Sequence, residues 1–356
     1  MARFVELSLT AQTAYSQLFD VTQAWELARS VATLHGSFAS KTVKGRRYWY
    51  FQFTDLSRTL RQLYVGPDSD RVRELISEAR QTRPEPIPAL ARSAVALGCA
   101  ALLSRHYRVI RRLSEYGFFR TGGVLIGTHA FLAYANLFGV RWGDASRTQD
   151  VDFAHAGKNL AVALPSSVQV DTRGAIESLE MGLLPITRLV AKSEATYLNP
   201  KDPEFRLDFL TTLHRNKEQQ YHHRQLGITL QPSKFMEYLL ENVGQAAVFS
   251  DEGSVVVNIP HPARYALHKL LVYGERTGSF LQKSRKDLFQ AAALLEVMRL
   301  RRAWEIDEAW SDLIGRGKGW STRAKQGLDA LAELAPDLDA KTWLRFPKAR
   351  RRIARP

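Results

Sequence analysis

The sequence predicts an α+β (mixed α/β) fold, in which a central sheet follows an N-terminal helix and β-hairpin region and precedes a C-terminal helical bundle. Helical and strand-like patterns alternate through the middle of the chain, which is typical of this class. Three prolines between Thr82 and Pro88 mark a domain boundary. Beyond residue 259, apolar residues recur at helical spacing. We therefore expect four regions, at residues 1–82, 89–258, 259–340 and 341–356.

The first region combines helices with aromatic, basic strands. Helices are expected up to about residue 35 and over 68–81, and aromatic and β-branched residues between about 41 and 67 predict a β-hairpin or a three-stranded sheet. Tyr48, Tyr50 and Phe51 lie next to Arg46 and Arg47 in this segment. These aromatic side chains either contact a nucleic acid or form the core of the small sheet, and the sequence leaves both readings open.

The central region begins with a long predicted helix from about Ala89 to Tyr116, in which the single cysteine, Cys99, is a core residue. An apolar strand then ends at Gly127 and Thr128, where a helix is expected to start. Short strands are predicted around Asp150 and Asp152 and again over 205–210, and a hairpin is predicted over 247–259.

The third region reads as a helical bundle with helices within 263–273, 284–295, 304–313 and 322–334. From Lys341 onward the chain contains basic residues and no acidic one. We expect this tail to be mobile and to contact phosphates without reading sequence.

Composition narrows the class of protein. The hydrophobic share of 45% and the charged share of 24% are those of an ordinary globular protein, and no apolar run approaches the length of a membrane span. A single cysteine excludes a disulfide scaffold, and together with the lack of a signal-like N-terminus it favours a cytoplasmic location. The formal net charge of +14 favours an anionic partner, with nucleic acid first, although many basic proteins use such charge only for solubility.

The strongest indication of chemical function is the pair of aspartates in the predicted strand around Asp150 and Asp152. Alternate residues of a strand share a face, so Asp150 and Asp152 point the same way. Two neighbouring carboxylates repel each other unless a cation lies between them, and hard divalent metals prefer such oxygen ligands. The small Gly127–Thr128 step at a helix start would let phosphates approach the backbone. The histidines, including His214, His222, His223, His261 and His268, have no strong metal spacing and are expected at the surface or facing nucleic acid.

Together these residues resemble the nucleotidyltransferase superfamily of the polymerase-beta type. Its signature is a hydrophobic-Gly-Gly/Ser step followed by Asp-hydrophobic-Asp/Glu, which here corresponds to Gly127-Thr128 and Asp150-Val151-Asp152. Thr128 replaces the usual Gly or Ser, and the longer gap before Asp150 implies an inserted loop containing Arg141, Trp142 and Arg147. The segments at residues 122–131 and 148–153 are most similar to a bacterial, uncharacterised nucleotidyltransferase-like branch. That branch is related to abortive-infection and toxin nucleotidyltransferases.

The resemblance implies a palm-like sheet and a magnesium- or manganese-dependent transfer from an NTP. It implies that Asp150, Asp152 and Asp208, the third on a later strand, are the catalytic and metal-binding carboxylates, and that Gly127 and Thr128 hold phosphates. A second likeness, to the toxin nucleotidyltransferases, assigns Lys269 to the triphosphate and Asp287 to its support, with Arg276 and Arg285 as weaker candidates. The alternative for these four residues is an ordinary helix pair with surface charges.

Three functions are consistent with the sequence. The first is nucleotide addition to RNA, such as tRNA, as a toxin-like or defence enzyme with an antitoxin protein as a partner. The second is the same chemistry on a protein or a small molecule. The third is a non-catalytic nucleic-acid-binding module on the same fold, which the three clustered carboxylates disfavour because negative charge does not help a polyanion to bind.

Overall fold

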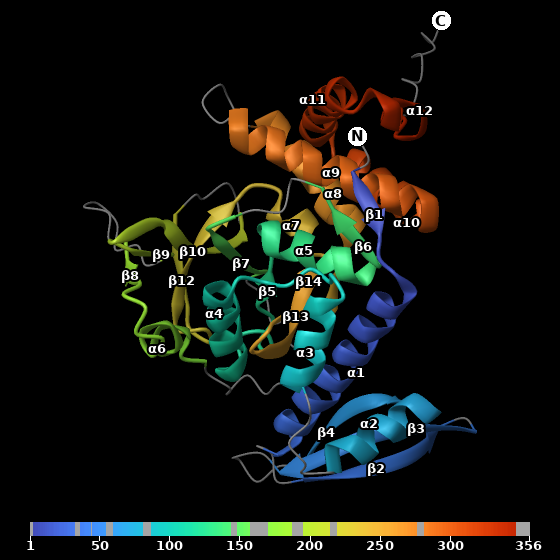
Figure 1. Cartoon of the computed structure of the whole chain (residues 1–356), viewed down its shortest axis with the longest axis vertical. Helices are drawn as coiled ribbons and strands as arrows, with labels where there is room; N and C mark the ends of the chain where they lie inside the picture. Colours follow the sequence, from blue (N-terminus) through green and yellow to red (C-terminus); the bar gives the residue numbers. More distant parts are fainter. Residues whose placement is uncertain are drawn as a thin grey trace, which may run out of the picture.

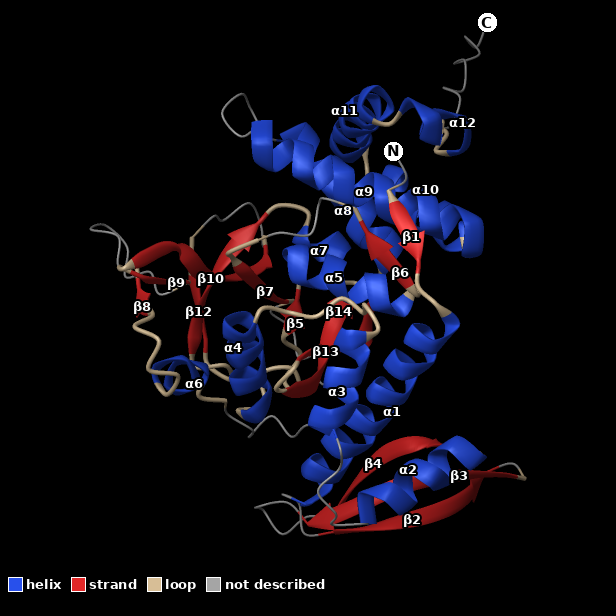
Figure 2. Cartoon of the chain, in the orientation of Figure 1, coloured by secondary structure: helices blue, strands red, loops and turns tan. Residues whose placement is uncertain are grey.

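The computed structural model describes residues 3–32, 36–43, 45–54, 60–80, 87–143, 148–156, 170–186, 195–213, 219–275 and 281–346. It confirms the predicted α+β architecture, with a central mixed sheet, a small N-terminal sheet and a helical C-terminal part (Figures 1 and 2). Among the helices in these ranges, none is long and apolar enough to cross a membrane.

The N-terminal part has one strand more than expected. A short strand, β1 (Phe4–Glu6), precedes the helix α1 (Leu9–Ala32). The aromatic segment forms an antiparallel three-stranded sheet of β2 (Gly36–Val43), β3 (Arg46–Thr54) and β4 (Leu60–Pro67), which is followed by α2 (Asp70–Arg80). The sheet lies at the end of α1 farthest from the C-terminal helices (Figure 1).

The prediction of one long helix over 89–116 is wrong, because the chain forms two helices there. They are α3 (Ile87–Ala96) and α4 (Ser104–Glu115). Gly98, between them, has a φ of +90°, a left-handed conformation that glycine adopts without steric cost and that ends a helix. Cys99 therefore lies in the connecting segment, buried as expected, and its thiol donates to the carbonyl oxygen of Ala11 at 3.4 Å.

The central sheet is built around two parallel strands. Strand β10 (Asp202–Thr212) pairs with β7 (Val151–His155) in parallel, and β5 (Val124–Leu125) adds antiparallel to the far side of β7. The other edge of β10 pairs first with β9 (Thr196–Asn199) and then with β12 (Ile228–Ser233). Strands β8 (Leu184–Pro185) and β11 (Tyr221–His223) complete the sheet, and α5 (Gly127–Leu137) and α6 (Thr172–Glu177) belong to the same region.

The predicted inserted loop is in part a strand. Arg141 and Trp142 form β6 (Val140–Trp142), which pairs antiparallel with β1. The Trp142 ring is buried, stacks on Phe131 at 4.7 Å between centroids, and donates from Nε1 to the Phe131 carbonyl oxygen at 2.7 Å. Arg147 lies outside the described residues.

The C-terminal part follows the predicted order of elements. After α7 (Met236–Leu239) comes the expected hairpin, β13 (Val243–Ser250) and β14 (Gly253–Pro260). The helices α8 (Pro262–Glu275), α9 (Leu281–Arg301), α10 (Ala303–Gly315) and α11 (Lys318–Leu334) form the bundle. One hydrophobic core runs through the central sheet and these helices, so the site described below is held between two parts of one packed body.

The basic tail begins later than predicted. A 3-10 turn (Pro336–Leu338) leads into α12 (Ala340–Trp343), and Lys341 forms an ion pair of 2.7 Å with Asp329. Leu344 is buried, and the Trp310 indole donates to the Arg345 carbonyl oxygen at 2.9 Å. The chain thus packs at least to this point, and residues 347–356 lie outside the described part.

Candidate active site

Two of the predicted carboxylates lie directly side by side on the central sheet. Asp152 on β7 and Asp208 on β10 are Cα partners in the parallel register. Their strand neighbours Val151, Leu207 and Phe209 are fully buried in the core, whereas Asp152 and Asp208 are only partly buried. Since side chains alternate along a strand, both carboxylates therefore project from the same face of the sheet. Thr196 of β9 donates from Oγ1 to Asp208 Oδ1 at 2.7 Å and orients that carboxylate.

The third predicted carboxylate is joined to them through an arginine. Asp150 immediately precedes β7, and its Oδ2 accepts a hydrogen bond of 3.1 Å from Nη2 of Arg206. Arg206 Nε lies 3.5 Å from Asp208 Oδ2. Burial alone would lower the pKa of Arg206, but the charges of Asp150, Asp208 and Asp152 outweigh it and the pKa is raised. The guanidinium is therefore a fixed positive charge among the three carboxylates.

Gly127 and Asp152 are in close contact at the start of α5. Gly127 has a φ of +62°, and a Cβ atom at this position would lie 2.1 Å from Asp152 Oδ2. The amide of Ile126, one residue earlier, donates to the Asp152 carbonyl oxygen at 3.0 Å. The glycine predicted from the sequence is thus required sterically, because it places the first turn of α5 against the carboxylate.

Residues from α8 and α9 contact this turn. The Tyr265 hydroxyl lies within hydrogen-bond distance of the Gly127 carbonyl oxygen (2.8 Å) and of Gln290 Oε1 (2.9 Å). Gln290 Nε2 donates to the buried hydroxyl of Thr128 at 3.3 Å. Burial, together with the charges of Asp287 and Asp152, raises the pKa of Tyr265 well above its usual value. The C-terminal helices therefore face the carboxylates of the sheet.

Lys269 and Asp287 form a buried ion pair beside Tyr265. Nζ of Lys269 lies 2.6 Å from Asp287 Oδ1, and the two side chains are 13% and 7% exposed. The same Nζ lies 5.0 Å from the centroid of the Tyr265 ring. The contact expected between these two residues is present, and the pair is largely buried. Arg285 is exposed on α9, and Arg276 lies outside the described residues.

The sequence reasoning missed a pair of buried histidines next to the carboxylates. His129 Nε2 lies 3.0 Å from His106 Nδ1, and the His106 ring stacks on Phe205. Burial, and then the charge of Arg105, lower the pKa of His106 to about 4, against an opposing effect of Asp150. No local sequence signal marks His106, because its partner His129 lies on a separate helix. Arg206 could have been predicted as a site residue from the sequence, because it precedes Asp208 by two residues and therefore lies on the same strand face.

The histidines that were expected at the surface or facing nucleic acid do not share one environment. His222 is exposed as expected. His223 and His268 are buried, which corrects the expectation for these two residues. The His223 ring packs edge-on against the buried His155 ring at 4.4 Å, because both strands contribute to the core. His261 pairs with Glu305 at 3.2 Å, and His214 lies outside the described residues.

The chemistry of the donors fits a hard divalent cation. Asp152 and Asp208 supply carboxylate oxygens from paired positions of two rigid strands, and oxygen ligands are those that Mg2+ prefers. Within the described ranges, no group of three or more His, Cys, Asp or Glu side chains is arranged to hold a metal. Arg206 instead contacts one oxygen each of Asp150 and Asp208. A metal held by all three carboxylates would therefore have to displace this guanidinium.

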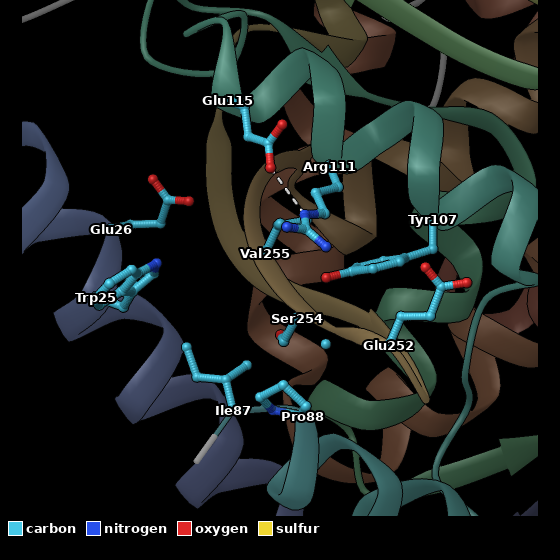
Figure 3. Close-up of a pocket in the computed structure, with 11 residues that line it drawn as sticks. Trp25, Glu26, Ile87, Pro88, Tyr107, Arg111, Glu115, Glu252, Ser254 and Val255 are labelled. Atoms are coloured by element: carbon cyan, nitrogen blue, oxygen red, sulfur yellow. Dashed lines mark hydrogen bonds and ion pairs between the residues drawn. The ribbon is translucent and has the colours of Figure 1, made fainter. Parts of the chain in front are cut away.

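A separate pocket of about 320 Å³ lies between α1, the start of α3, α4 and β14 (Figure 3). Trp25 and Tyr107 lie on its walls, together with the ion pair of Arg111 and Glu115 at 2.9 Å. The pocket contains none of the candidate site residues, and we assign it no part in the chemistry.

A comparison with protein families finds that residues 104–315 match the family model described as Nucleotidyltransferase. This match spans more than half of the chain and runs from α4 to α10. The chain belongs to this nucleotidyltransferase family. All seven candidate residues, from Gly127 to Asp287, lie inside the matched segment, and the protein is accordingly a nucleotidyltransferase that uses an NTP.

Among solved structures, this nucleotidyltransferase is similar to an antigenic nucleotidyltransferase-like protein from Paracoccidioides brasiliensis. The two share 14% sequence identity, and the alignment covers 64% of this chain and 95% of the other, with a TM-score of 0.29. Among curated proteins, no relative matches the sequence.

Proposed function

We propose that this nucleotidyltransferase transfers a nucleoside monophosphate from an NTP to an RNA acceptor, with Mg2+ or Mn2+ as the cofactor. The observation that supports this most is the pairing of Asp152 with Asp208 at one register of the sheet, directly against Gly127 at the start of a helix. Carboxylates for a cation and free helix amides for phosphates are both needed for nucleotidyl transfer, and here they are adjacent.

The start of α5 would bind the triphosphate. The first backbone N–H groups of a helix have no partner within the helix and attract anions. Gly127 brings these groups close to the carboxylates, and Thr128 adds a hydroxyl that Gln290 orients. Lys269 would supply positive charge to the phosphates, and Asp287 would hold its ammonium in place.

Asp150, Asp152 and Asp208 would hold the metal ion. When bound, such an ion offsets the negative charge that develops on the attacking and leaving oxygens. Asp208, oriented by Thr196, would also accept the proton of the acceptor hydroxyl. That hydroxyl oxygen forms a bond to the α-phosphorus, the bond between the α-phosphorus and the bridging oxygen breaks, and pyrophosphate leaves.

The choice of RNA rests on charge. The chain has 50 lysines and arginines against 36 acidic residues, and a net charge of +14 attracts a polyanion more than a neutral small molecule. A toxin-like or defence role restrained by an antitoxin protein is a further part of the proposal. That role rests on the likeness to toxin nucleotidyltransferases, and growth arrest on expression that disappears in Asp152→Asn would support it.

The first experiment incubates the purified protein with Mg2+, each α-labelled NTP and total cellular RNA, beside Asp152→Asn and Asp208→Asn. We expect the wild type to label one RNA size class and both variants to label none. Label on protein with none on RNA would replace RNA by a protein acceptor. No transfer to any acceptor, with RNA still bound, would overturn the catalytic proposal in favour of a binding module.

A further inference from the structure

The three-stranded N-terminal sheet has one face covered and one face open. Along β3, Trp49 and Phe51 share one face, and Tyr48 and Tyr50 share the other. Phe51 is 2% exposed, and the Trp49 indole donates to Asp68, just before α2, at 2.7 Å. Helix α2 lies across the sheet (Figure 2), and its Val72 side chain packs where a Cβ of Gly66, the Cα partner of Trp49, would point. The sequence left two roles for these aromatic residues, and the structure divides them between the two faces.

The open face carries three tyrosines, of which Tyr64 contacts the other two. Tyr64 of β4 is the Cα partner of Tyr50. The Tyr64 ring lies edge-on to Tyr50 at 5.6 Å and tilted to Tyr48 at 6.2 Å between centroids. Tyr64 is 58% exposed, so its ring is available to a ligand. We call Tyr48, Tyr50 and Tyr64 the tyrosine face.

Two basic side chains lie beside the tyrosine face. Lys41 of β2 is the Cα partner of Tyr48, and its Nζ lies 5.3 Å from the centroid of Tyr50 while it donates to Gln62. Arg46, at an alternate position to Tyr48, is exposed. Over residues 36–67 the sequence has six lysines and arginines and one acidic residue, Asp55. A flat aromatic surface within a basic patch is complementary to exposed bases and phosphates.

We propose that the tyrosine face binds unpaired nucleotides of the RNA acceptor, with bases on the rings and phosphates beside Lys41 and Arg46. That the bound strand belongs to the acceptor rests on the proposed function, whereas binding itself does not. The sheet lies at the bottom of the view in Figure 1, apart from the carboxylate-bearing strands β7 and β10. Its contribution is therefore to hold a long acceptor, which acts on the KM for RNA and leaves kcat unchanged.

Binding is tested in an Asp152→Asn background, so that no chemistry interferes. The variant Tyr50→Leu/Tyr64→Leu keeps apolar bulk in the sheet and removes the aromatic faces. Its affinity for a fluorescent single-stranded RNA should fall at least about tenfold, since stacking contributes about fivefold or more per base and the variant removes two rings. Tyr116→Leu, at an exposed tyrosine directly after α4, is the control and should bind like the parent. Circular dichroism and thermal melting establish that each variant is folded.

Salt dependence tests the charged part of the site. Lys41→Gln/Arg46→Gln should reduce the slope of log affinity against log salt by about 1.4, the value for two phosphate contacts on a single strand. Equal binding by Tyr50→Leu/Tyr64→Leu and its parent, or equal binding of single-stranded and duplex RNA, would overturn the inference. Tyrosine-dependent binding without any transfer would reject only the proposed function. Transfer to RNA with an unchanged KM in the tyrosine variant would reject only the tyrosine face.

Discussion

At Gly127, both the backbone conformation and the neighbouring Asp152 carboxylate exclude a side chain. A side chain at this position would need a left-handed backbone and would clash with the Asp152 carboxylate. We expect Gly127→Ala to lose about 1–2 kcal/mol of stability from the backbone and nearly all transfer activity, because Asp152 must move. Gly98→Ala is the matched control, since Gly98 also has a positive φ but nothing within 4 Å of an added Cβ. Activity in Gly127→Ala equal to that in Gly98→Ala would show that the contact with Asp152 does not matter.

Arg206 contacts carboxylate oxygens that the proposed metal ion would use. Its guanidinium contacts both Asp150 and Asp208, so it neutralises and occupies ligands that a divalent cation would use. We expect Arg206→Gln to bind Mn2+ several-fold more tightly than the wild type, measured by titration with electron paramagnetic resonance. Arg105→Gln, which removes an arginine paired with Asp202, serves as a control for general loss of charge. Weaker Mn2+ binding in Arg206→Gln would mean that the arginine supports the metal site.

At the scale of elements, α8 and α9 are joined by Lys269 and Asp287. Asp287→Asn leaves a mostly buried ammonium without its partner, and we expect a loss of about 3–5 kcal/mol in the free energy of unfolding. The double variant Lys269→Met/Asp287→Leu should recover most of this stability, since apolar residues can replace a buried pair. If Lys269 also binds phosphates, the double variant will be stable and yet will bind NTP poorly, as followed by calorimetry. Normal NTP affinity in the double variant would limit the pair to a structural role.

The sequence predicted elements well where the pattern was local. Period-two alternation identified β7 and β10, and helical spacing identified α8 to α11. It missed β1 and β6, which become strands by pairing with each other across more than 130 residues. It also missed the break between α3 and α4, because apolar residues lie on both sides of Gly98. The acidic residues and Gly127 of the candidate site were visible in short motifs, whereas the pairing of His106 with His129 depends on the packing of two helices.

At the scale of the whole molecule, we expect four of the buried histidines to control how the fold responds to acid. His106, His129, His155 and His223 are each at most 5% exposed. Burial is the main cause that lowers the pKa of all four, to about 4 for His106 and His223 and well below the usual value for His129. In the unfolded chain these groups titrate near a pKa of about 6.5. Between pH 6.5 and 4 the unfolded state therefore binds more protons than the folded state.

Stability should consequently be fully present above pH 6.5 and be lost as the pH falls toward 4, by up to about 1.4 kcal/mol per pH unit for each such histidine. We expect the melting temperature to fall steeply in this window, measured between pH 7.5 and 4.5. His223→Asn should flatten the fall, because one fewer buried imidazole takes up a proton on unfolding. His222→Asn, at the exposed neighbouring position, should melt with the same pH dependence as the wild type. An equal fall in His223→Asn and the wild type would show that the buried imidazoles do not control the acid response.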